Sequence, residues 1–472
     1  MRTANYLAGV WQEQGEALHT VRDAYTGAVI AEVSLADASA MDKAIASAAD
    51  ARSTLEALGA EERAARLEHL AATLFDRSEE FAQLIRREAG KPITYARTEV
   101  ARAITTVKLA AAAGLQLQDE EIDVDYDAGR GRRAWVRRVP VGVVAAITPF
   151  NFPLNLVLHK VAPALAMGCP VVLKPAPQTP LTALLLAELI DALRFPAGSF
   201  STVPCNTGVA EQLVKDERVA LLSFTGSDSV GWRLKEICGR KRVALELGGN
   251  AAVIVDEGTD LASAATLIAQ GAFAYAGQTC ISTQRIYVVE PLFAAFRDAL
   301  LEATQHIVSG DPARAEVHNG PLIDAHHCAR IARWVEEAQQ AGATVLCGGQ
   351  VLDPAHNVYA PTLLTGTRPS MRINADEAFG PVAVVEPARD FDDALQLVNA
   401  SRFGLQAGLF STNEHHIQRA FAELEVGGLI INGAPGLRVD GMPYGGVKHS
   451  GLGREGPRYT MDEMSERRVL LR

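Results

Sequence analysis

Hydrophobic periodicity divides this chain into a helical N-terminal part and a longer part in which strands and helices alternate. Residues 1–33 show short strands and turns. The helical period of 3.6 residues then predicts four Ala-rich or amphipathic helices, over residues 37–58, 61–76, 79–89 and 94–117. The last helix carries Val100, Ile104 and Val107 on one apolar stripe, and Arg102 lies off that stripe.

Residues 122–139 change to a period of two. Two alternating runs flank Gly129-Arg130-Gly131, which predicts a β-hairpin. The runs are too polar for a hairpin in the core. An arm that pairs with another subunit would explain this composition.

From residue 140 onward, strands and helices alternate. Strands are predicted over 141–147, 171–174, 200–203, 221–224 and 243–247, with helices over 153–167, 181–193, 209–215 and 229–239. Repeated β-α units indicate a parallel, doubly wound sheet, which binds ligands at the carboxyl ends of its strands. A second α/β pattern covers residues 251–432, so the predicted fold class is α/β with two closely packed halves. A glycine-rich loop over 441–456 and a predicted edge strand at Val469–Leu471 follow.

Composition is that of a globular protein. The chain has 472 residues, enough for two or three domains, of which 48% are hydrophobic and 21% charged. Its net charge of −11, without long blocks of one sign, argues against nucleic acid and anionic membrane surfaces as partners. Residues 154–173 are the most apolar stretch, but His159, Lys160 and two prolines interrupt them too often for a membrane span.

The six cysteines form neither a C-x-x-C pair nor a zinc-binding pattern. We therefore expect free thiols, a reducing compartment and no metal. The first residues carry acidic side chains and no continuous apolar core, so no signal peptide is expected. A cytoplasmic protein of enzyme size is the resulting expectation.

Cys280 has unusual neighbours for a structural cysteine. Small and polar residues flank it in the segment GAFAYAGQTCISTQR, whereas structural cysteines usually have large apolar neighbours. Such a segment can approach a ligand closely, and a nucleophilic role would require the thiolate form. The alternative is a half-buried, inert thiol, and the cysteine alone does not decide between them.

Polar residues follow the predicted strands of the first half. Asn151 is expected to cap the next helix through its side-chain oxygen, and its amide NH2 would remain free to donate to an oxyanion. Lys174 is either a solvated charge or a donor to ribose hydroxyls. Gly226 and Ser227 open a helix whose N-terminus can receive a phosphate.

Two glutamates are also candidate functional residues. Glu246 follows three apolar residues at the end of the fifth strand. It is either a surface-facing strand end or a general base whose pKa is raised by burial. Glu377 and Phe379 lie in a Gly-Pro turn, where each alone would be an ordinary loop residue.

Taken together, these segments resemble a known family. PFNFP, KP, FTGS, ELGG, FAYAGQTC, EAFGP and PYGGVKHSGLGREG occur in the order found in the aldehyde dehydrogenase superfamily. The resemblance covers nearly the whole chain, and the combination is far more specific than any single motif. The C-terminal loop and the length look most like the lactaldehyde, non-phosphorylating glyceraldehyde-3-phosphate and phosphonoacetaldehyde dehydrogenases. NAD(P)-dependent oxidation of an aldehyde to a carboxylate is therefore implied.

The resemblance implies a role for each catalytic residue. Cys280 matches the nucleophile that attacks the aldehyde carbon. Asn151 and the backbone N–H of Cys280 would hold the resulting oxyanion, and hydride would then leave for the nicotinamide. Glu246 would activate the water that hydrolyses the thioester.

The resemblance also implies the domains and the cofactor contacts. A Rossmann-like NAD(P)-binding domain is expected over residues 1–120 and 140–250, a catalytic domain over 251–440, and a β oligomerisation arm over 121–139 and 457–472. The arm would build a homodimer or homotetramer. The expected contacts to NAD or NADP are Ile147, Thr148, Phe150, Lys174, Pro175, Pro177, Gly208, Gly226, Ser227, Val230, Leu247, Glu377 and Phe379.

Three positions depart from the family pattern. Phe150 replaces the usual Trp, which is a conservative change. Pro177 stands where NAD-specific members often carry Glu, so we expect NADP to be accepted, alone or alongside NAD. Thr279 precedes the nucleophile where phosphate-binding relatives tend to carry Arg, which weakens the case for a phosphorylated substrate.

The aldehyde tunnel is expected to include Arg102, His159, Thr279 and Arg438. Structural roles are open for three of them: Arg102 could pair with Glu99, His159 could be a satisfied buried histidine, and Arg438 could be a surface loop charge. Jointly they predict a short polar or anionic aldehyde, because an arginine can hold a carboxylate, phosphonate or phosphate through two parallel hydrogen bonds.

Two other functions compete with this prediction. A CoA-acylating dehydrogenase would pass the acyl group to CoA, but such relatives usually lack the glutamate that Glu246 supplies. A non-catalytic structural or binding relative would be indicated by loss of Cys280 or Asn151, and both are present.

Overall fold

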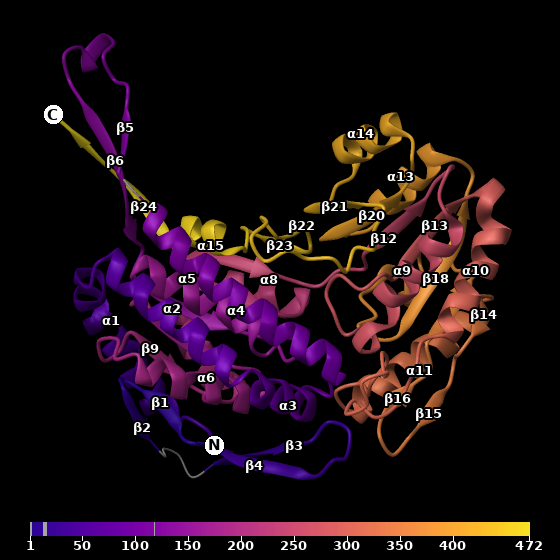
Figure 1. The fold of residues 1–472 in the computed structure, drawn as a ribbon, viewed down its shortest axis with the longest axis horizontal. Coiled ribbons are helices and arrows are strands. Elements are labelled where there is room, and N and C mark those ends of the chain that lie inside the picture. The colour runs from indigo at the N-terminus through magenta and orange to yellow at the C-terminus, as the bar shows by residue number, and fades with distance from the viewer. Residues whose placement is uncertain (1, 13–16, 118) are drawn as a thin grey trace.

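The computed structural model describes residues 2–12, 17–117 and 119–472, and it shows two α/β lobes and a projecting β arm (Figure 1). The strands of the first lobe are β1 (Asn5–Leu7), β2 (Val10–Gln12), β3 (Leu18–Arg22), β4 (Val29–Ser34), β7 (Val143–Ile147), β8 (Val171–Lys174), β9 (Phe200–Thr202), β10 (Val219–Thr225), β11 (Arg242–Glu246), β22 (Val447–Lys448) and β23 (Gly451–Leu452). Its helices are α1 (Ala38–Ala57), α2 (Ala60–Asp76), α3 (Ser78–Ala89), α4 (Ile93–Gln116), α5 (Asn155–Met167), α6 (Pro180–Ala192), α7 (Thr207–Lys215), α8 (Asp228–Ile237) and α15 (Pro457–Glu463).

The second lobe follows the same α/β plan. Its strands are β12 (Ala252–Val255), β13 (Arg285–Val289), β14 (Thr344–Cys347), β15 (Val351–Asp353), β16 (Val358–Tyr359), β17 (Thr362–Thr365), β18 (Val382–Ala388), β19 (Phe403–Gly404), β20 (Gln406–Phe410) and β21 (Gly428–Ile431). Its helices are α9 (Leu261–Phe273), α10 (Phe293–Gln305), α11 (Ala325–Gln340), α12 (Arg372–Ala375), α13 (Phe391–Asn399) and α14 (Glu414–Glu423), with 3-10 turns η2 (Ala274–Gly277) and η3 (Glu290–Leu292).

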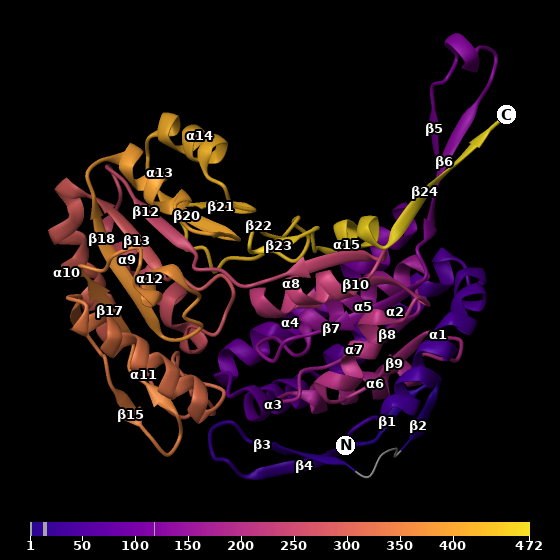
Figure 2. The ribbon, with the colours of Figure 1, turned by 180° about the vertical axis from the view of Figure 1, so that it is seen from behind.

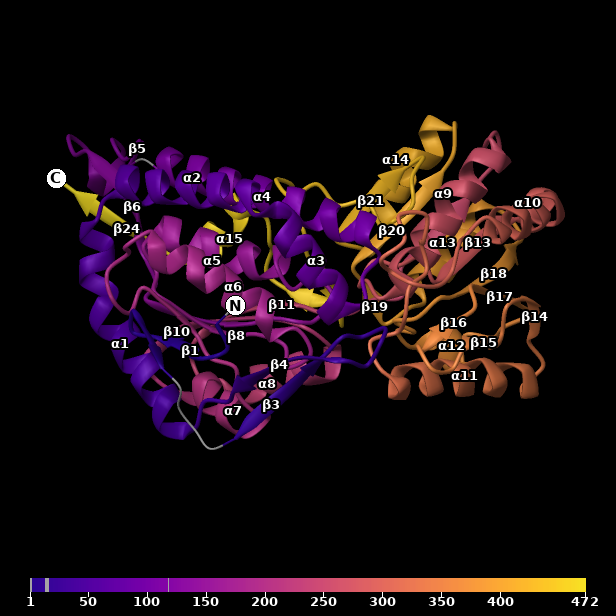
Figure 3. The same ribbon diagram turned by 60° about the horizontal axis from the view of Figure 1, so that its bottom comes forward.

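The first sheet has the order β2-β1-β9-β8-β7-β10-β11-β23, and β9 to β11 run parallel. All five residues of β7 are buried. Because side chains alternate along a strand, Val144 and Ala146 join the core under α4, α5 and α6, whereas Val143 and Ala145 join the core under α1 and α7. Figure 3 shows these helix layers on opposite sides of the sheet. The predicted doubly wound α/β fold is confirmed.

The second sheet has the order β14-β17-β18-β13-β12-β20-β21, and only its edge strand β14 pairs antiparallel among these strands. The chain then returns to the first lobe. There β23 pairs with β11, so that Gly451 lies opposite Glu246. The glycine-rich C-terminal loop is thereby brought to the strand end that carries Glu246.

The arm differs from the hairpin predicted for residues 122–139. Its strands are β5 (Glu120–Ile122), β6 (Ala134–Pro140) and β24 (Ser465–Leu471), in the order β24-β6-β5, and it projects from the first lobe with the C-terminus on it (Figures 1 and 2). The expected first strand is mostly a loop that contains the turn η1 (Asp127–Gly129). In that loop Asp125 accepts from the backbone N–H of Gly131 at 2.6 Å, and such side-chain bonds compete with strand pairing.

Candidate active site

A cavity of about 560 Å³ lies where the carboxyl edge of the first sheet meets the second lobe. Ten of the residues predicted from sequence line it: Phe150, Asn151, Gly226, Ser227, Glu246, Leu247, Cys280, Glu377, Phe379 and Arg438. The three expected catalytic side chains, from β11 and from the loops before α5 and β13, therefore face one space.

Cys280 reaches the cavity through an unusual turn. After α9 ends at Phe273, Tyr275, Ala276 and Gly277 all adopt left-handed backbone angles, with φ of 53°, 54° and 64°. A Cβ on Gly277 would lie 2.2 Å from the carbonyl oxygen of Gly380, so only glycine fits there. This turn breaks the helical direction and places the half-buried thiol in the cavity. Burial raises the pKa of Cys280 to about 12.

Asn151 does not cap the following helix, contrary to one of the two predictions for it. Helix α5 begins at Asn155, and Glu99 of α4 accepts from the backbone N–H groups of Leu154 and Asn155, at 2.9 and 3.2 Å. The carboxylate of a distant helix thus replaces the expected cap. The amide of Asn151 instead donates to the carbonyl of Gln278 at 3.0 Å, two residues before Cys280.

Glu246 is buried, so it is not a surface-facing strand end. Its Oε2 atom has no hydrogen-bond partner among the described residues. Burial, with the nearby negative charge of Glu455, raises the pKa of Glu246 well above its usual value. Gly445 packs against this carboxyl group at φ 159°, where an added Cβ would lie 2.8 Å from Oε1. A buried carboxyl group with a raised pKa and an oxygen without a partner has the properties of a general base.

Arg438 is buried in the cavity wall, which contradicts the alternative of a surface loop charge. Only 6% of its side chain is exposed, and it contacts Glu455 at 3.1 Å. Its guanidinium also stacks over the ring of Tyr444, 3.8 Å from the centroid. Glu455 is shared with the buried Lys160, at 2.7 Å. Burial alone would raise the pKa of Glu455, but the positive charges of Lys160 and Arg438 hold this pKa well below its usual value.

Arg102 and His159 do not line the cavity and instead meet at Asp440. Arg102 contacts both carboxylate oxygens of Asp440, at 3.0 and 2.8 Å, so the structure supports neither its predicted place in the tunnel nor the alternative pairing with Glu99. Glu99 pairs with Lys91 instead. His159 is fully buried, with its Nε2 atom 2.9 Å from Asp440, and burial lowers its pKa to about 4. The structural alternative of a satisfied buried histidine therefore holds at Nε2 only, because the buried Nδ1 atom has no partner among the described residues.

Glu377 and Phe379 approach the cavity from the second lobe. Burial raises the pKa of Glu377 to about 7, and its Oε1 atom accepts from the backbone N–H of Gly249 at 3.1 Å. A Cβ on Gly248 would lie 2.2 Å from this carboxylate, so glycine is required for the approach. Phe379 packs edge-on against Phe150, with ring centroids 5.8 Å apart.

The remaining expected cofactor residues extend from the cavity along the same sheet edge. Ile147, Thr148, Lys174, Pro175, Pro177, Gly208 and Val230 lie at or just after the ends of β7, β8, β9 and β10 and do not line the cavity. Burial lowers the pKa of Lys174. Pro177 is exposed, and its carbonyl lies 2.7 Å from the Nε2 atom of His19. Thr279 is half-buried and also lies outside the cavity lining.

A dinucleotide fits the residues along this edge. Thr225 lines the cavity, and its buried hydroxyl has no partner among the described residues, which leaves it available to a ligand. Ser227 precedes α8 without using its side chain as a cap, and the first backbone N–H groups of the helix point toward an anion in such a position.

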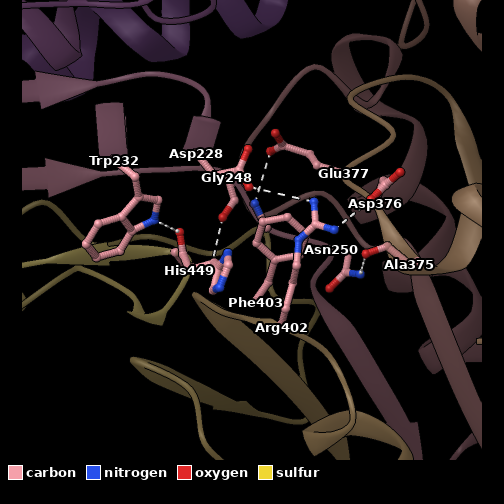
Figure 4. Close-up of polar contacts among 12 residues, drawn as sticks. Asp228, Trp232, Gly248, Asn250, Ala375, Asp376, Glu377, Arg402, Phe403 and His449 are labelled. Carbon is pink, nitrogen blue, oxygen red and sulfur yellow. Dashed lines mark hydrogen bonds and ion pairs between the residues drawn. The ribbon is translucent and has the colours of Figure 1, made fainter. Parts of the chain in front are cut away.

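Arg402 joins the two lobes at the cavity. Figure 4 shows its guanidinium between Asp228, in the first turn of α8, and Asp376 of the second lobe. The ion-pair distances are 3.7 Å and 2.8 Å.

Sequence reasoning missed several of these residues, among them Lys160, Tyr444, Glu455, Asp440 and Arg402. Lys160 carried a signal, because a charge inside an apolar helix requires a partner. Tyr444 and Glu455 lie within a recognised motif, but nothing in their spacing indicates what they touch. Arg402 pairs with residues 174 and 26 positions away, so no local pattern identifies it.

The fold and the site define a class of protein. A parallel sheet with a ligand cavity at its carboxyl edge, facing a second α/β lobe, is typical of dinucleotide-dependent dehydrogenases. The chain belongs to the aldehyde dehydrogenase family, whose sequence profile matches residues 11–470.

Its relatives agree with this assignment. The chain is 42% identical to a 3-sulfolactaldehyde dehydrogenase of Priestia aryabhattai, over 99% of this chain and 97% of the relative. Aldehyde dehydrogenase 21 of Physcomitrella patens, solved with its reaction product succinate, superposes with a TM-score of 0.97 at 40% identity, covering 99% and 98% of the two chains. An NADP-bound glyceraldehyde-3-phosphate dehydrogenase of Methanocaldococcus jannaschii superposes with a TM-score of 0.92 at 34% identity, covering 98% and 100%.

These matches confirm the predicted class of enzyme and its NAD(P) cofactor. Over the described part of the chain, none of the helices is long and apolar enough to cross a membrane.

Proposed function

We propose that this enzyme oxidises a short anionic aldehyde to a carboxylate by covalent catalysis at Cys280. The observation that carries the proposal is that Cys280, Asn151 and Glu246 line one cavity. A thiol, an amide donor and a buried carboxyl group are the three groups that acyl transfer to water requires.

The chemistry of the first step falls to Cys280 and Asn151. The thiolate sulfur attacks the aldehyde carbon, and the carbonyl electrons move to oxygen. The amide of Asn151 and the backbone N–H of Cys280 donate to this oxyanion. The hydride would leave for NAD or NADP held at the sheet edge, and its departure from the carbon would leave a thioester on Cys280.

Glu246 acts in the second step. In its ionised form it takes a proton from water, which attacks the thioester carbon and releases the carboxylate product and the thiol. Because an ionised Glu246 can do this without CoA, hydrolysis is favoured over transfer to CoA.

We assign cofactor binding to residues at the carboxyl edge of the first sheet. Lys174 and Glu377 would bind ribose hydroxyls, Gly226, Ser227 and the unpaired hydroxyl of Thr225 would receive the pyrophosphate end, and Phe379 would lie beside the nicotinamide ribose. Pro177 carries no carboxylate that would repel a 2′-phosphate, which supports use of NADP, alone or alongside NAD.

The anionic substrate is supported by the charge around Arg438. The two cations Lys160 and Arg438 share the single carboxylate of Glu455, so this ion-pair cluster carries one positive charge in excess. The Nε atom of Arg438 is buried and has no partner among the described residues. The relatives named above act on sulfolactaldehyde, yield succinate or take glyceraldehyde 3-phosphate, and all three molecules carry an anionic group.

The activity itself is tested by reduced-cofactor absorbance from a C2–C4 aldehyde with a terminal carboxylate or sulfonate, with each cofactor and without CoA. We expect turnover without CoA. Absorbance that depended on added CoA would contradict the hydrolytic mechanism.

The anion site is tested with Arg438→Ala. We expect kcat/KM for the anionic aldehyde to fall about 10- to 100-fold, since a hydrogen bond to a charged group contributes about 1.5–3 kcal/mol. The value for hexanal should change much less. Arg102→Ala is the matched control, because the guanidinium of Arg102 is already paired with Asp440. Equal losses for both aldehydes would refute an anion site at Arg438.

A further inference from the structure

The sulfur of Cys280 has one polar side-chain neighbour that the mechanism above does not use. The hydroxyl oxygen of Tyr444 lies 3.1 Å from Sγ, within hydrogen-bonding distance. Tyr444 is 3% exposed and lines the same cavity. A buried phenol so close to the reacting atom can affect its ionisation.

The position of Tyr444 is fixed on two sides. Its backbone N–H donates to the carbonyl of Glu455 at 2.9 Å, and its own carbonyl accepts from the N–H of the same residue. The guanidinium of Arg438 covers one face of its ring. The hydroxyl is therefore held toward Cys280 by the loop that also presents the proposed anion-binding arginine.

The direction of this hydrogen bond is decided by ionisation. In the neutral pair either atom can donate, since both the thiol and the phenol carry a proton. A thiolate has no proton, so only the phenol can donate to it, and hydrogen bonds to charged acceptors are stronger than neutral ones. Burial raises the pKa of Tyr444 well above its usual value, so the phenol retains its proton as a donor.

We propose that Tyr444 is a further catalytic residue, whose hydroxyl donates to the thiolate of Cys280 and increases the fraction of enzyme that is ready to attack. The proposal rests on the proposed role of Cys280 as nucleophile. The thiol proton leaves to solvent, and the sulfur electron pair then forms the new S–C bond. The hydrogen bond weakens at that point, because a neutral thioether sulfur is a weak acceptor.

The test is the alkylation of Cys280 by iodoacetamide in the full-length protein, followed by mass spectrometry of its peptide between pH 6 and 10. Tyr444→Phe keeps the ring and removes the donor. If loss of the Tyr444 hydroxyl raises the pKa of the Cys280 thiol by one to two, the thiolate fraction falls 10- to 100-fold. The remaining thiolate is intrinsically more reactive, by about threefold per unit, so we expect alkylation to slow by about three- to tenfold at each pH below the pKa.

Tyr287→Phe is the matched control. It removes another buried tyrosine hydroxyl, one that contacts Arg285 in the second sheet at 3.3 Å. We expect it to alkylate at the native rate. Native-rate alkylation of Tyr444→Phe across the pH range would overturn the proposal, and so would equal slowing in both variants.

A failure of the proposed function would look different. Cys280→Ala would then retain turnover, whatever the alkylation rates show. If Cys280→Ala is inactive and Tyr444→Phe alkylates at the native rate, the nucleophile stands and the role of Tyr444 does not.

Discussion

At the scale of single residues, burial sets the protonation state of the groups that would do the chemistry. Cys280, Glu246 and Glu377 all have a raised pKa because they are removed from water. A resting enzyme with a neutral thiol is protected from reaction with solvent oxidants, since thiolates are the reactive form. Under the proposal above, activation of the thiol depends on donation from Tyr444.

The raised pKa of Glu246 predicts the pH dependence of turnover. A general base works only when it is ionised, so steady-state turnover should fall as pH drops through the pKa of Glu246, which lies well above that of an ordinary carboxyl group. Glu246→Gln should still give a burst of about one reduced cofactor per site, with turnover at least about a hundredfold lower. Stopped-flow absorbance separates the burst from turnover. Steady turnover near the native rate in Glu246→Gln would show that another group activates the water.

At the scale of elements, the site depends on contacts between segments far apart in the chain. Asp440 joins the C-terminal loop to two helices: it accepts from Arg102 of α4, and from Asn155 and His159 of α5, the Asn155 contact being 3.1 Å. Burial alone would raise the pKa of Asp440, but the hydrogen bonds from His159 and Arg102 hold this pKa well below its usual value. The same loop carries Arg438 and Tyr444, so we expect Asp440 to help to position both.

Asp440→Ala should therefore be strongly destabilising. Three buried or partly buried donors lose their acceptor, and we expect a loss of about 2–4 kcal/mol in the free energy of unfolding, together with reduced kcat/KM. Arg402→Ala is a useful comparison. It removes the more exposed ion pairs between the lobes, which should cost less than about 1 kcal/mol. Urea denaturation followed by tryptophan fluorescence measures both, and equal losses would contradict this ranking.

At the scale of the whole molecule, the arm exposes apolar side chains at the edge of its sheet. It projects away from both lobes (Figures 1 and 2). Val469, Leu470 and Leu471 of β24 are 60%, 50% and 49% exposed at the edge of a three-stranded sheet. Exposed apolar side chains on an unpaired edge are typical of an interface, which supports the expected homodimer or homotetramer.

A variant with Val469→Lys and Leu471→Lys should dissociate, because charges on the strand edge oppose pairing with a second copy. Analytical ultracentrifugation should show dimers or tetramers of the native chain and smaller species of the variant, with unchanged circular dichroism. Leu352→Lys, at a 48% exposed position in β15, is the control and should leave the assembly intact. A native chain that sediments as a monomer would refute the role of the arm.

The sequence by itself indicated the strands and helices of the first lobe, because these elements depend on local hydrophobic periodicity. It also indicated the residues that gather at the sheet edge, since parallel strands bring their carboxyl ends together. The resemblance of its motifs to a family then indicated an NAD(P)-dependent aldehyde oxidation.

Only the tertiary structure decided which polar groups pair. Glu99 caps α5 in place of Asn151, and Asp440 pairs with Arg102. The hydroxyl of Tyr444 contacts the sulfur of Cys280, although the two residues are 164 positions apart. Hydrogen bonds and ion pairs depend on positions in space, and their partners here are separated by 55 to 338 residues. No periodicity along the chain encodes such pairs, so the electrostatics of the site became visible only in the folded molecule.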